Sequence, residues 1–171
     1  NENKNEYVRL YINHKLKNSV SEQTKAFCEG FENFIDYKLI RMFTPVELDL
    51  IICGNKTIDI EDMKKYIHYS GNYHDKHPVI VMFFKVLSNW SQENLSKFLL
   101  FLTGSSQIGV NGFEAYNDNG DFITIASGGA KDHLPVAHTC CYQLDLPEYD
   151  NEKDMNDKLL LAINETRFGI A

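Results

Sequence analysis

The chain has 171 residues, of which 43% are hydrophobic and 24% are charged, and its formal net charge is −7. This length fits one large domain or two small ones, and the composition is globular rather than disordered or collagen-like. The acidic balance argues against a nucleic-acid partner, and the longest apolar runs fall short of the about 18 residues that a membrane span needs.

The first part of the chain has the spacing of helices. Apolar and aromatic side chains recur at intervals of three and four residues in two stretches: Tyr7, Leu10, Tyr11 and His14, then Val20, Thr24, Phe27 and Phe31. Thr44, Pro45 and Glu47 form the start of a third helix, with a capping box, and a short fourth helix follows Asp59. We therefore predict an all-helical unit over residues 1–66.

The segment 67–77 differs in character, because small and polar residues dominate it. It is bounded by Pro78, which suits the first position of the next helix. We predict a hinge over 67–77, centred on Tyr69, Ser70 and Gly71. Such a segment also fits a plain surface loop.

Residues 78–171 mix helical and strand patterns. Helices are predicted over 79–87, from Ser91 to Gly104, and after Asn151. The runs DFITIA (121–126) and CYQLDLP (141–147) have the alternation of strands. The predicted fold class is α+β, with a helical N-terminal piece, a hinge, and an α/β lobe with a small sheet and flanking helices.

The densest group of reactive side chains lies in LPVAHTCCYQLDLP, residues 134–147. A thiolate attacks carbonyl carbon and leaves readily, so Cys140 on a loop near His138 can accept and release an acyl group. Two small buried cysteines are the plain alternative. A zinc site with His133 is a further alternative, but adjacent cysteines do not have the spacing of a chelating pair, and we predict no metal. A papain-like enzyme is excluded, because no histidine follows Cys140.

These residues also carry a family resemblance, since the segment 134–147 resembles the catalytic motif of HECT-type ubiquitin ligase domains. The matching residues are Leu134, Pro135, Ala137, His138, Thr139, Cys140, Leu144, Asp145, Leu146 and Pro147. The runs EQTKAFCEGF, ELDLIICG, LLFLTGSS, VNGF and LLLAINET are similar to the family in the same order. The resemblance covers nearly the whole chain, which is identified as the C-terminal portion of such a domain.

The resemblance implies an activity and partners. Cys140 would take ubiquitin as a thioester from a ubiquitin-conjugating enzyme and pass it to a lysine of a protein substrate, without a cofactor. His138 and Thr139 would flank the nucleophile, and Leu134 and Pro135 would support the loop. Residues 1–66 would end the N-terminal lobe, 67–77 would be the inter-lobe hinge, and 78–171 would be the catalytic C-terminal lobe. The four cysteines, which form no Cys-x-x-Cys pair, favour a reducing compartment, cytoplasmic or nuclear.

Roles for other residues stay open. His138 would either assist proton transfer or shape the loop. Phe168 resembles a phenylalanine that helps the late ligation step, and the alternative is an anchor for the tail. Tyr7 and Tyr11 match positions that contact the conjugating enzyme in some members, and the alternative is a helix stripe packed in a core.

The motif also departs from the family, because Cys141, Tyr142 and Gln143 stand where Phe, Asn and a variable residue are usual. Two other functions remain open. One is a catalytically silent ubiquitin-binding or scaffold domain that keeps the fold. The other is an unrelated acyl-transferring or hydrolysing cysteine enzyme.

Overall fold

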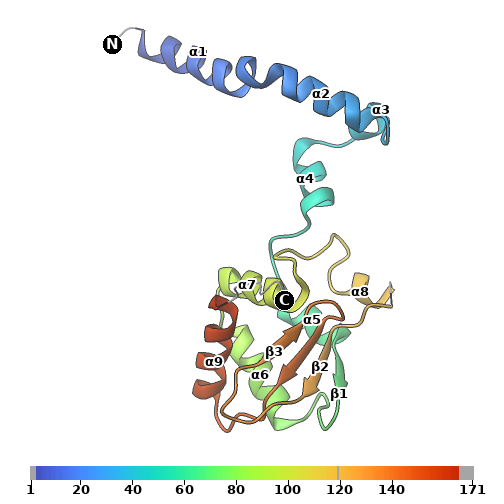
Figure 1. Ribbon diagram of the computed structural model, residues 1–171, viewed down its shortest axis with the longest axis vertical. Helices are drawn as coiled ribbons and strands as arrows, with labels where there is room; N and C mark the ends of the chain where they lie inside the picture. The colour runs from blue at the N-terminus through green and yellow to red at the C-terminus, as the bar shows by residue number, and fades with distance from the viewer. Residues whose placement is uncertain (1–2, 119, 166–171) are drawn as a thin grey trace. The chain divides into compact units, whose positions relative to one another are not determined.

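The computed structural model describes residues 3–118 and 120–165, and the chain divides into two compact units, Asn1–Leu48 and Asp49–Ala171 (Figure 1). The α+β prediction is confirmed, because helices occupy the first unit and a four-stranded sheet with helices forms the second. None of the helices in the described part of the chain combines the length and apolar character that a bilayer span requires.

The first unit is helical, as its spacing predicts. It contains α1 (Lys4–Leu16), a 3₁₀ turn (Asn18–Val20), α2 (Ser21–Glu32), α3 (Tyr37–Ile40) and the start of α4 (Pro45–Cys53). The capping box of α4 is confirmed: the Glu47 amide donates to Thr44 Oγ1 over 3.3 Å, and the Thr44 amide donates to Glu47 Oε2 over 2.7 Å. None of these helices has a buried residue, so local hydrogen bonds and caps rather than a core define the unit.

The second unit is built on a mixed sheet with the strand order β1-β2-β4-β3. The strands are β1 (His68–Ser70), β2 (Thr124–Ser127), β3 (Val136–His138) and β4 (Gln143–Leu146). The neighbours β1 and β2, and likewise β2 and β4, are parallel, whereas β3 and β4 are antiparallel. Alternation places Ile125, Leu144 and Leu146 in the core, and this leaves Gln143 and Asp145 on the more accessible face.

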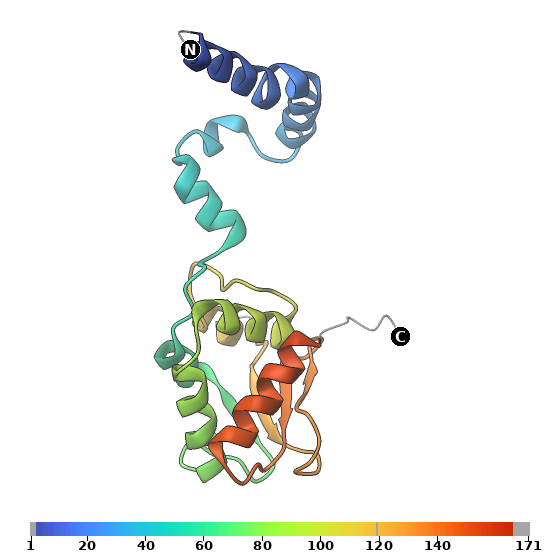
Figure 2. The same cartoon turned by 90° about the vertical axis from the view of Figure 1, so that its left-hand side faces the viewer.

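Helices pack around this sheet. They are α5 (Ile60–Tyr66), α6 (Pro78–Ser88), α7 (Gln92–Thr103), α8 (Glu114–Asp118) and α9 (Glu152–Asn164), with α6 and α9 on the same side (Figures 1 and 2). The predicted caps are present, because Ser91 Oγ accepts from the Asn94 amide and Asn151 Oδ1 accepts from the Asp154 amide. The apolar faces of α6, α7 and α9 and the inner side chains of the sheet form one core, which begins at Ile58.

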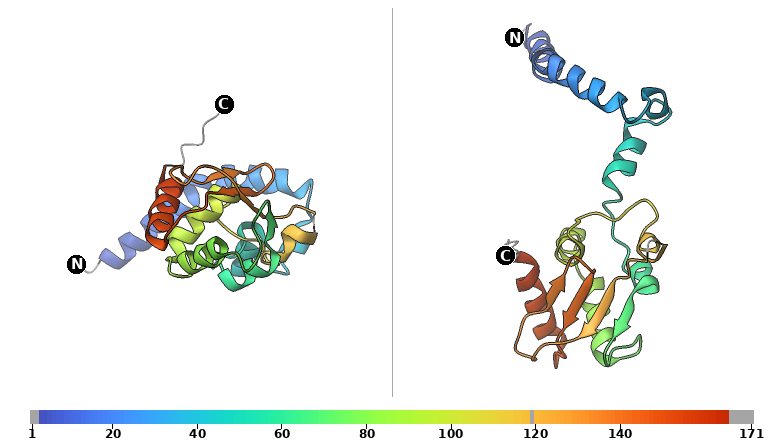
Figure 3. Two further views of the ribbon diagram at one scale, coloured as in Figure 1. Left: turned by 90° about the horizontal axis from the view of Figure 1, so that it is seen from below. Right: turned by 45° about the vertical axis from the view of Figure 1, so that its right-hand side comes forward.

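The segment expected as a hinge, 67–77, contains a strand that the sequence pattern did not indicate. Residues 68–70 form strand β1 beside β2, which the right-hand view of Figure 3 shows as the outer strand of the sheet. Gly71 has a φ of +71°, and a Cβ there would lie 2.3 Å from Ser127 Oγ, so this turn requires glycine. The Asn72 amide also donates to Ser127 Oγ over 3.1 Å. The segment is therefore part of the second unit, and the division of the chain lies between Leu48 and Asp49.

The physical reason for this difference is the composition of the segment. Only Ile67 and Tyr73 are buried in it, and polar side chains on the accessible positions hide the strand pattern. Tyr73 is 5% exposed, and its hydroxyl donates to the Leu146 carbonyl over 2.8 Å. A mostly polar segment with two buried apolar residues thus contains the edge strand β1. An edge strand pairs on one side only and needs little apolar surface.

Candidate active site

Cys140 lies in the turn of the β3–β4 hairpin. Strand β3 ends at His138 and β4 begins at Gln143, so residues 139–142 make the connection. The Cys141 amide donates to the His138 carbonyl over 3.2 Å, and Tyr142 has a φ of +50°, a left-handed conformation that lets the short loop close. The predicted nucleophile is exposed and is a free cysteine, and Thr139 beside it is exposed too.

His138 and Asp145 form a bonded pair at the base of this turn. His138 is opposite Gln143 in the hairpin, so Asp145 is its diagonal neighbour on the same face. His138 Nε2 lies 2.9 Å from Asp145 Oδ2, and Gln143 Nε2 donates to Asp145 Oδ1 over 2.7 Å. Partial burial opposes ionisation of Asp145, but the bonds from Gln143 and His138 prevail and hold the pKa of that carboxyl below its ordinary value. The pair fixes the orientation of the His138 ring within the hairpin.

A tyrosine joins the other side of the turn to the sheet and to α8. The Thr124 amide donates to the Tyr142 carbonyl over 3.0 Å. The Tyr142 ring meets the Tyr116 ring edge-on, with centroids 5.1 Å apart. The aromatic ring that departs from the family motif therefore holds the turn, and a hollow of about 150 Å³ adjoins it, lined by Gly109, Ala115, Tyr116, Asp121 and Tyr142.

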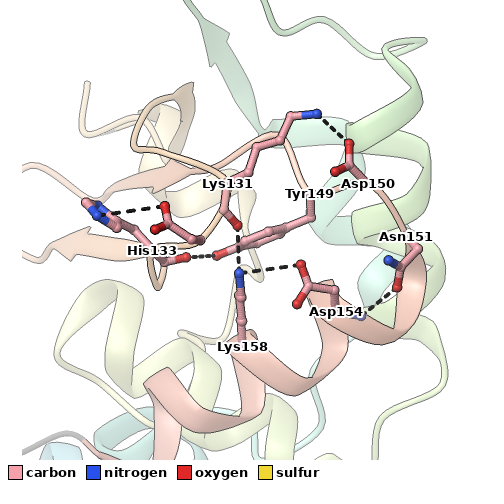
Figure 4. A network of polar contacts seen from close by, with 8 residues as sticks. Lys131, His133, Tyr149, Asp150, Asn151, Asp154 and Lys158 are labelled. Atoms are coloured by element: carbon pink, nitrogen blue, oxygen red, sulfur yellow. Dashed lines mark hydrogen bonds and ion pairs between the residues drawn. The ribbon is translucent and has the colours of Figure 1, made fainter.

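The segment that leads into β3 is tied to the end of the sheet and to α9, as Figure 4 shows. Tyr149 is 2% exposed, and its hydroxyl donates to the His133 carbonyl over 2.8 Å; burial raises its pKa. Lys158 reaches from α9 to the Lys131 carbonyl over 2.6 Å and pairs with Asp154 at 3.4 Å. These contacts fix the loop that carries Leu134 and Pro135.

Leu134 and Pro135, the two residues expected to support the loop, come directly after this anchored segment. Pro135 is buried and Leu134 is half-buried, so the chain enters β3 from a packed position. The chain is packed before β3, the Tyr142 carbonyl is bonded to the sheet after the turn, and His138 is bonded to Asp145 at its base. Cys140 is therefore exposed at a defined position. This arrangement can present a thiol to a large acyl donor, because nothing in the described residues buries the turn.

The remaining predicted site residues lie elsewhere. Tyr7 and Tyr11 lie one turn apart on α1 in the first unit, with ring centroids 6.1 Å apart, and they are 67% and 52% exposed. Tyr69, Ser70 and Gly71 belong to β1 and the turn after it. Phe168 lies outside the described residues.

The donor set that suggested a metal is not gathered into one cluster in the described residues. No group of three or more His, Cys, Asp or Glu side chains is placed to hold an ion within residues 3–118 and 120–165. The His133 ring is near Asp132, 3.9 Å away, whereas the His138 ring is bonded to Asp145.

Three residues of the site received no role from the sequence: Asp145, Tyr149 and Lys158. Asp145 could have been found, because a four-residue turn at 139–142 places residues 138 and 145 diagonally on one face. The motif letters HTCCYQLD contain that spacing. Tyr149 and Lys158 carry no such signal, because their partners are backbone carbonyls of a loop that precedes them by 16 and 27 residues.

Comparisons with known proteins agree on one family. A family model described as HECT-domain (ubiquitin-transferase) matches residues 1–171. E3 ubiquitin-protein ligase Nedd-4 of Drosophila melanogaster is 40% identical over 165 residues, which are 95% of this chain and 16% of the relative. E3 ubiquitin-protein ligase RSP5 of Saccharomyces cerevisiae is 42% identical over 166 residues, 96% of this chain and 20% of the relative.

A human relative gives the same result. E3 ubiquitin-protein ligase NEDD4 of Homo sapiens is 38% identical over 169 residues, which are 98% of this chain and 13% of the relative. The chain therefore spans at most 20% of the length of these three relatives.

Proposed function

Because the chain belongs to the HECT ubiquitin-transferase family, we propose that it is the catalytic part of a ubiquitin-protein ligase and that Cys140 is its nucleophile. The substrate is ubiquitin, delivered as a thioester by a ubiquitin-conjugating enzyme. The final acceptor is a lysine amine of a protein substrate. No metal or cofactor takes part in this scheme.

The relay has two acyl-transfer steps. In the first, the Cys140 thiolate attacks the carbonyl carbon of the donor thioester, and the thiolate of the conjugating enzyme leaves. In the second, a neutral lysine amine attacks the Cys140 thioester, an isopeptide bond forms, the amine gives up one proton, and Cys140 leaves as the free thiol. Thiol exchange is nearly thermoneutral, so the first step needs access and thiolate character rather than strong activation.

One observation carries the proposal: Cys140 is exposed in the turn of a hairpin whose base is fixed by the His138–Asp145 bond. An acyl group as large as ubiquitin requires a projecting thiol, and a defined backbone position aligns that thiol with its acceptor. The His138 ring is bonded to Asp145, which favours a role in shaping the turn. Thr139, Leu134 and Pro135 would maintain the turn and its entry strand.

The proposal extends to residues outside this hairpin. Tyr7 and Tyr11 would contribute to binding of the conjugating enzyme, since their rings form one exposed stripe. Phe168 would assist the second step, so deleting residues 168–171 should slow transfer to lysine more than loading of Cys140. A reducing compartment, cytoplasmic or nuclear, would keep the nucleophile as a thiol.

A thioester trap tests the proposal. The protein is mixed with ubiquitin activated at its C-terminus as a small-molecule thioester, and in parallel with activating enzyme, conjugating enzyme, ATP and ubiquitin. Wild type, Cys140→Ser and the matched control Cys141→Ser are compared with and without reductant. The small thioester makes loading independent of binding to the conjugating enzyme.

We expect wild type and Cys141→Ser to form a ubiquitin adduct that reductant removes. Cys140→Ser should form at most an oxyester adduct that reductant leaves intact. Absence of an adduct on wild type from both donors would support the silent ubiquitin-binding domain instead. Release of free ubiquitin into water, with none passed to added lysine, would support a hydrolase.

A further inference from the structure

The turn that carries the proposed nucleophile contains a second thiol. Cys140 and Cys141 are adjacent in sequence, both are exposed, and both are free cysteines. The other two cysteines, Cys28 in α2 and Cys53 at the end of α4, are exposed as well but have no cysteine neighbour in sequence. The pair is therefore the one place in the described chain where two thiols share a single turn.

The contacts of Cys141 distinguish it from its neighbour. Its Sγ lies 3.6 Å from the His138 carbonyl oxygen, toward which the thiol donates, and its backbone amide bonds the same oxygen. The pKa of the Cys141 thiol is raised, first by partial desolvation and then by the neighbouring Cys140. Cys141 is thus a second exposed thiol on the residue next to the proposed nucleophile.

We propose that Cys140 and Cys141 form a peroxide-responsive thiol pair in which Cys141 resolves oxidised Cys140 as an intramolecular disulfide. In the first step the Cys140 thiolate attacks hydrogen peroxide, which leaves a sulfenic acid on Cys140 and releases hydroxide. In the second step the Cys141 sulfur attacks the sulfenic sulfur, so that the disulfide forms and the thiol proton and the sulfenic hydroxyl leave as water. Peroxide is the oxidant, and an external thiol reverses the reaction by exchange.

The geometry predicts that this disulfide is easily reduced. Consecutive Cα atoms lie about 3.8 Å apart across a trans peptide, below the about 4.4–6.8 Å of ordinary disulfides. The bridge closes a small ring that includes the intervening peptide bond, and strained disulfides are the more reducible ones. Residues 139–142 lie in a turn rather than in the strand ladder, so the backbone change does not break the β3–β4 pairing.

The consequence for ubiquitin transfer rests on the proposed function. A Cys140 sulfur in a disulfide cannot form a thioester, so oxidation would stop loading. Formation of the disulfide also prevents further oxidation to the sulfinic acid, which external thiols do not reverse. Cys141 would therefore make loss of activity reversible.

The experiment uses a Cys28→Ser/Cys53→Ser background, in which the pair supplies the only thiols, and the same background with Cys141→Ser. Each protein is treated with about one equivalent of hydrogen peroxide, then with dimedone to trap sulfenic acid and with a maleimide to label free thiols. Intact mass is measured before and after a reductant. No ubiquitin is present, so the result does not depend on the proposed ligase activity.

We expect the pair to lose about 2 Da, to resist both labels, and to regain both thiols with reductant. Cys141→Ser should instead carry dimedone on residue 140. Dimedone labelling of Cys140 to the same extent in both proteins would overturn the proposal, as would a disulfide-linked dimer on a non-reducing gel. In a separate sample with excess peroxide, a second equivalent of which carries an unresolved sulfenic acid on to the sulfinic acid, thioester loading after reductant should recover in the paired background and stay several-fold lower in Cys141→Ser.

Discussion

Asp145 shows how one residue supports the reactive turn. Its carboxylate binds His138 at 2.9 Å and Gln143 at 2.7 Å, and its pKa is held below the ordinary value. A lowered folded-state pKa means that the stabilisation is complete above the ordinary aspartate pKa and is lost as the pH falls through the lower, folded-state pKa.

Asp145→Asn should therefore reduce the free energy of unfolding near neutral pH by about 0.5–1 kcal/mol, since the pair is partly exposed. The difference from wild type should shrink below about pH 4. Urea denaturation at several pH values measures it, with Glu148→Gln, an exposed carboxylate after β4, as the control. A pH-independent difference would show that the charge of Asp145 has no part in the effect.

Tyr73 gives the opposite pH dependence. Burial, followed by the charge of Glu148, raises the pKa of Tyr73 to about 12, and its hydroxyl donates to the Leu146 carbonyl. A raised folded-state pKa gives stability that is present below the ordinary tyrosine pKa and is lost as the pH rises toward about 12.

Tyr73→Phe should cost about 1 kcal/mol of unfolding free energy at neutral pH through the lost hydrogen bond. Its stability should also fall less than that of wild type between about pH 10 and 12. Urea denaturation across this range checks both effects, and Tyr37→Phe, at an exposed tyrosine of α3, is the control. An equally steep alkaline loss in Tyr73→Phe would contradict the assignment.

At the scale of elements, loss of an N-cap should have different effects in two helices because the helices differ in burial. Asn151 caps α9, whose buried face includes Met155, Leu159 and Ile163. Thr44 caps α4, which has no buried residue. The single tryptophan, Trp90, reports on α9, because its Nε1 donates to Asn156 Oδ1 over 2.8 Å.

Asn151→Ala should lower the free energy of unfolding by about 1 kcal/mol, a typical value for loss of a cap. Thr44→Ala should leave the transition followed by Trp90 fluorescence unchanged, since fraying of α4 exposes no core. Equal losses in the two variants would mean that α4 unfolds together with the second unit.

At the scale of the whole molecule, the distribution of buried residues decides which part folds by itself. Every residue of the hydrophobic core lies at or after Ile58, whereas the described helices before it have no buried residue. Burial of apolar surface is the main favourable contribution to folding, so the second unit should contain nearly all the cooperative stability.

A fragment of residues 49–171 should therefore unfold in urea at the same midpoint as the full chain, as measured by Trp90 fluorescence. The matched fragment 78–171, which begins after the expected hinge, loses β1 and the buried residues Ile58, Ile60, Met63, Ile67 and Tyr73. It should have a much lower midpoint or no cooperative transition. Equal urea midpoints for the two fragments would support the expected domain boundary at 67–77.

The sequence alone determined much of this protein. Periodic apolar spacing and capping residues located the helices at Pro45, Pro78, Ser91 and Asn151, because these signals are local and each helix closes its own hydrogen bonds. Alternation located β2 and β4. The motif around Cys140 indicated the family, which the comparisons confirm.

Only the tertiary structure decided the remaining features, because they depend on residues far apart in the chain. Strand β1 forms by pairing with β2, whose partner residues are 56 positions away (His68 with Thr124). The sequence of β1 by itself has the polar composition of a hinge. Strand β4, which follows the reactive turn, is joined to β2 through residues 19 positions away (Thr124 with Gln143). The anchors of the loop before β3, Tyr149 and Lys158, bind backbone carbonyls, which any residue offers. The chemistry of the thiol could thus be predicted from residue types, whereas the anchoring of its hairpin depends on the pairing of β4 with β2 and on the contacts of Tyr149 and Lys158.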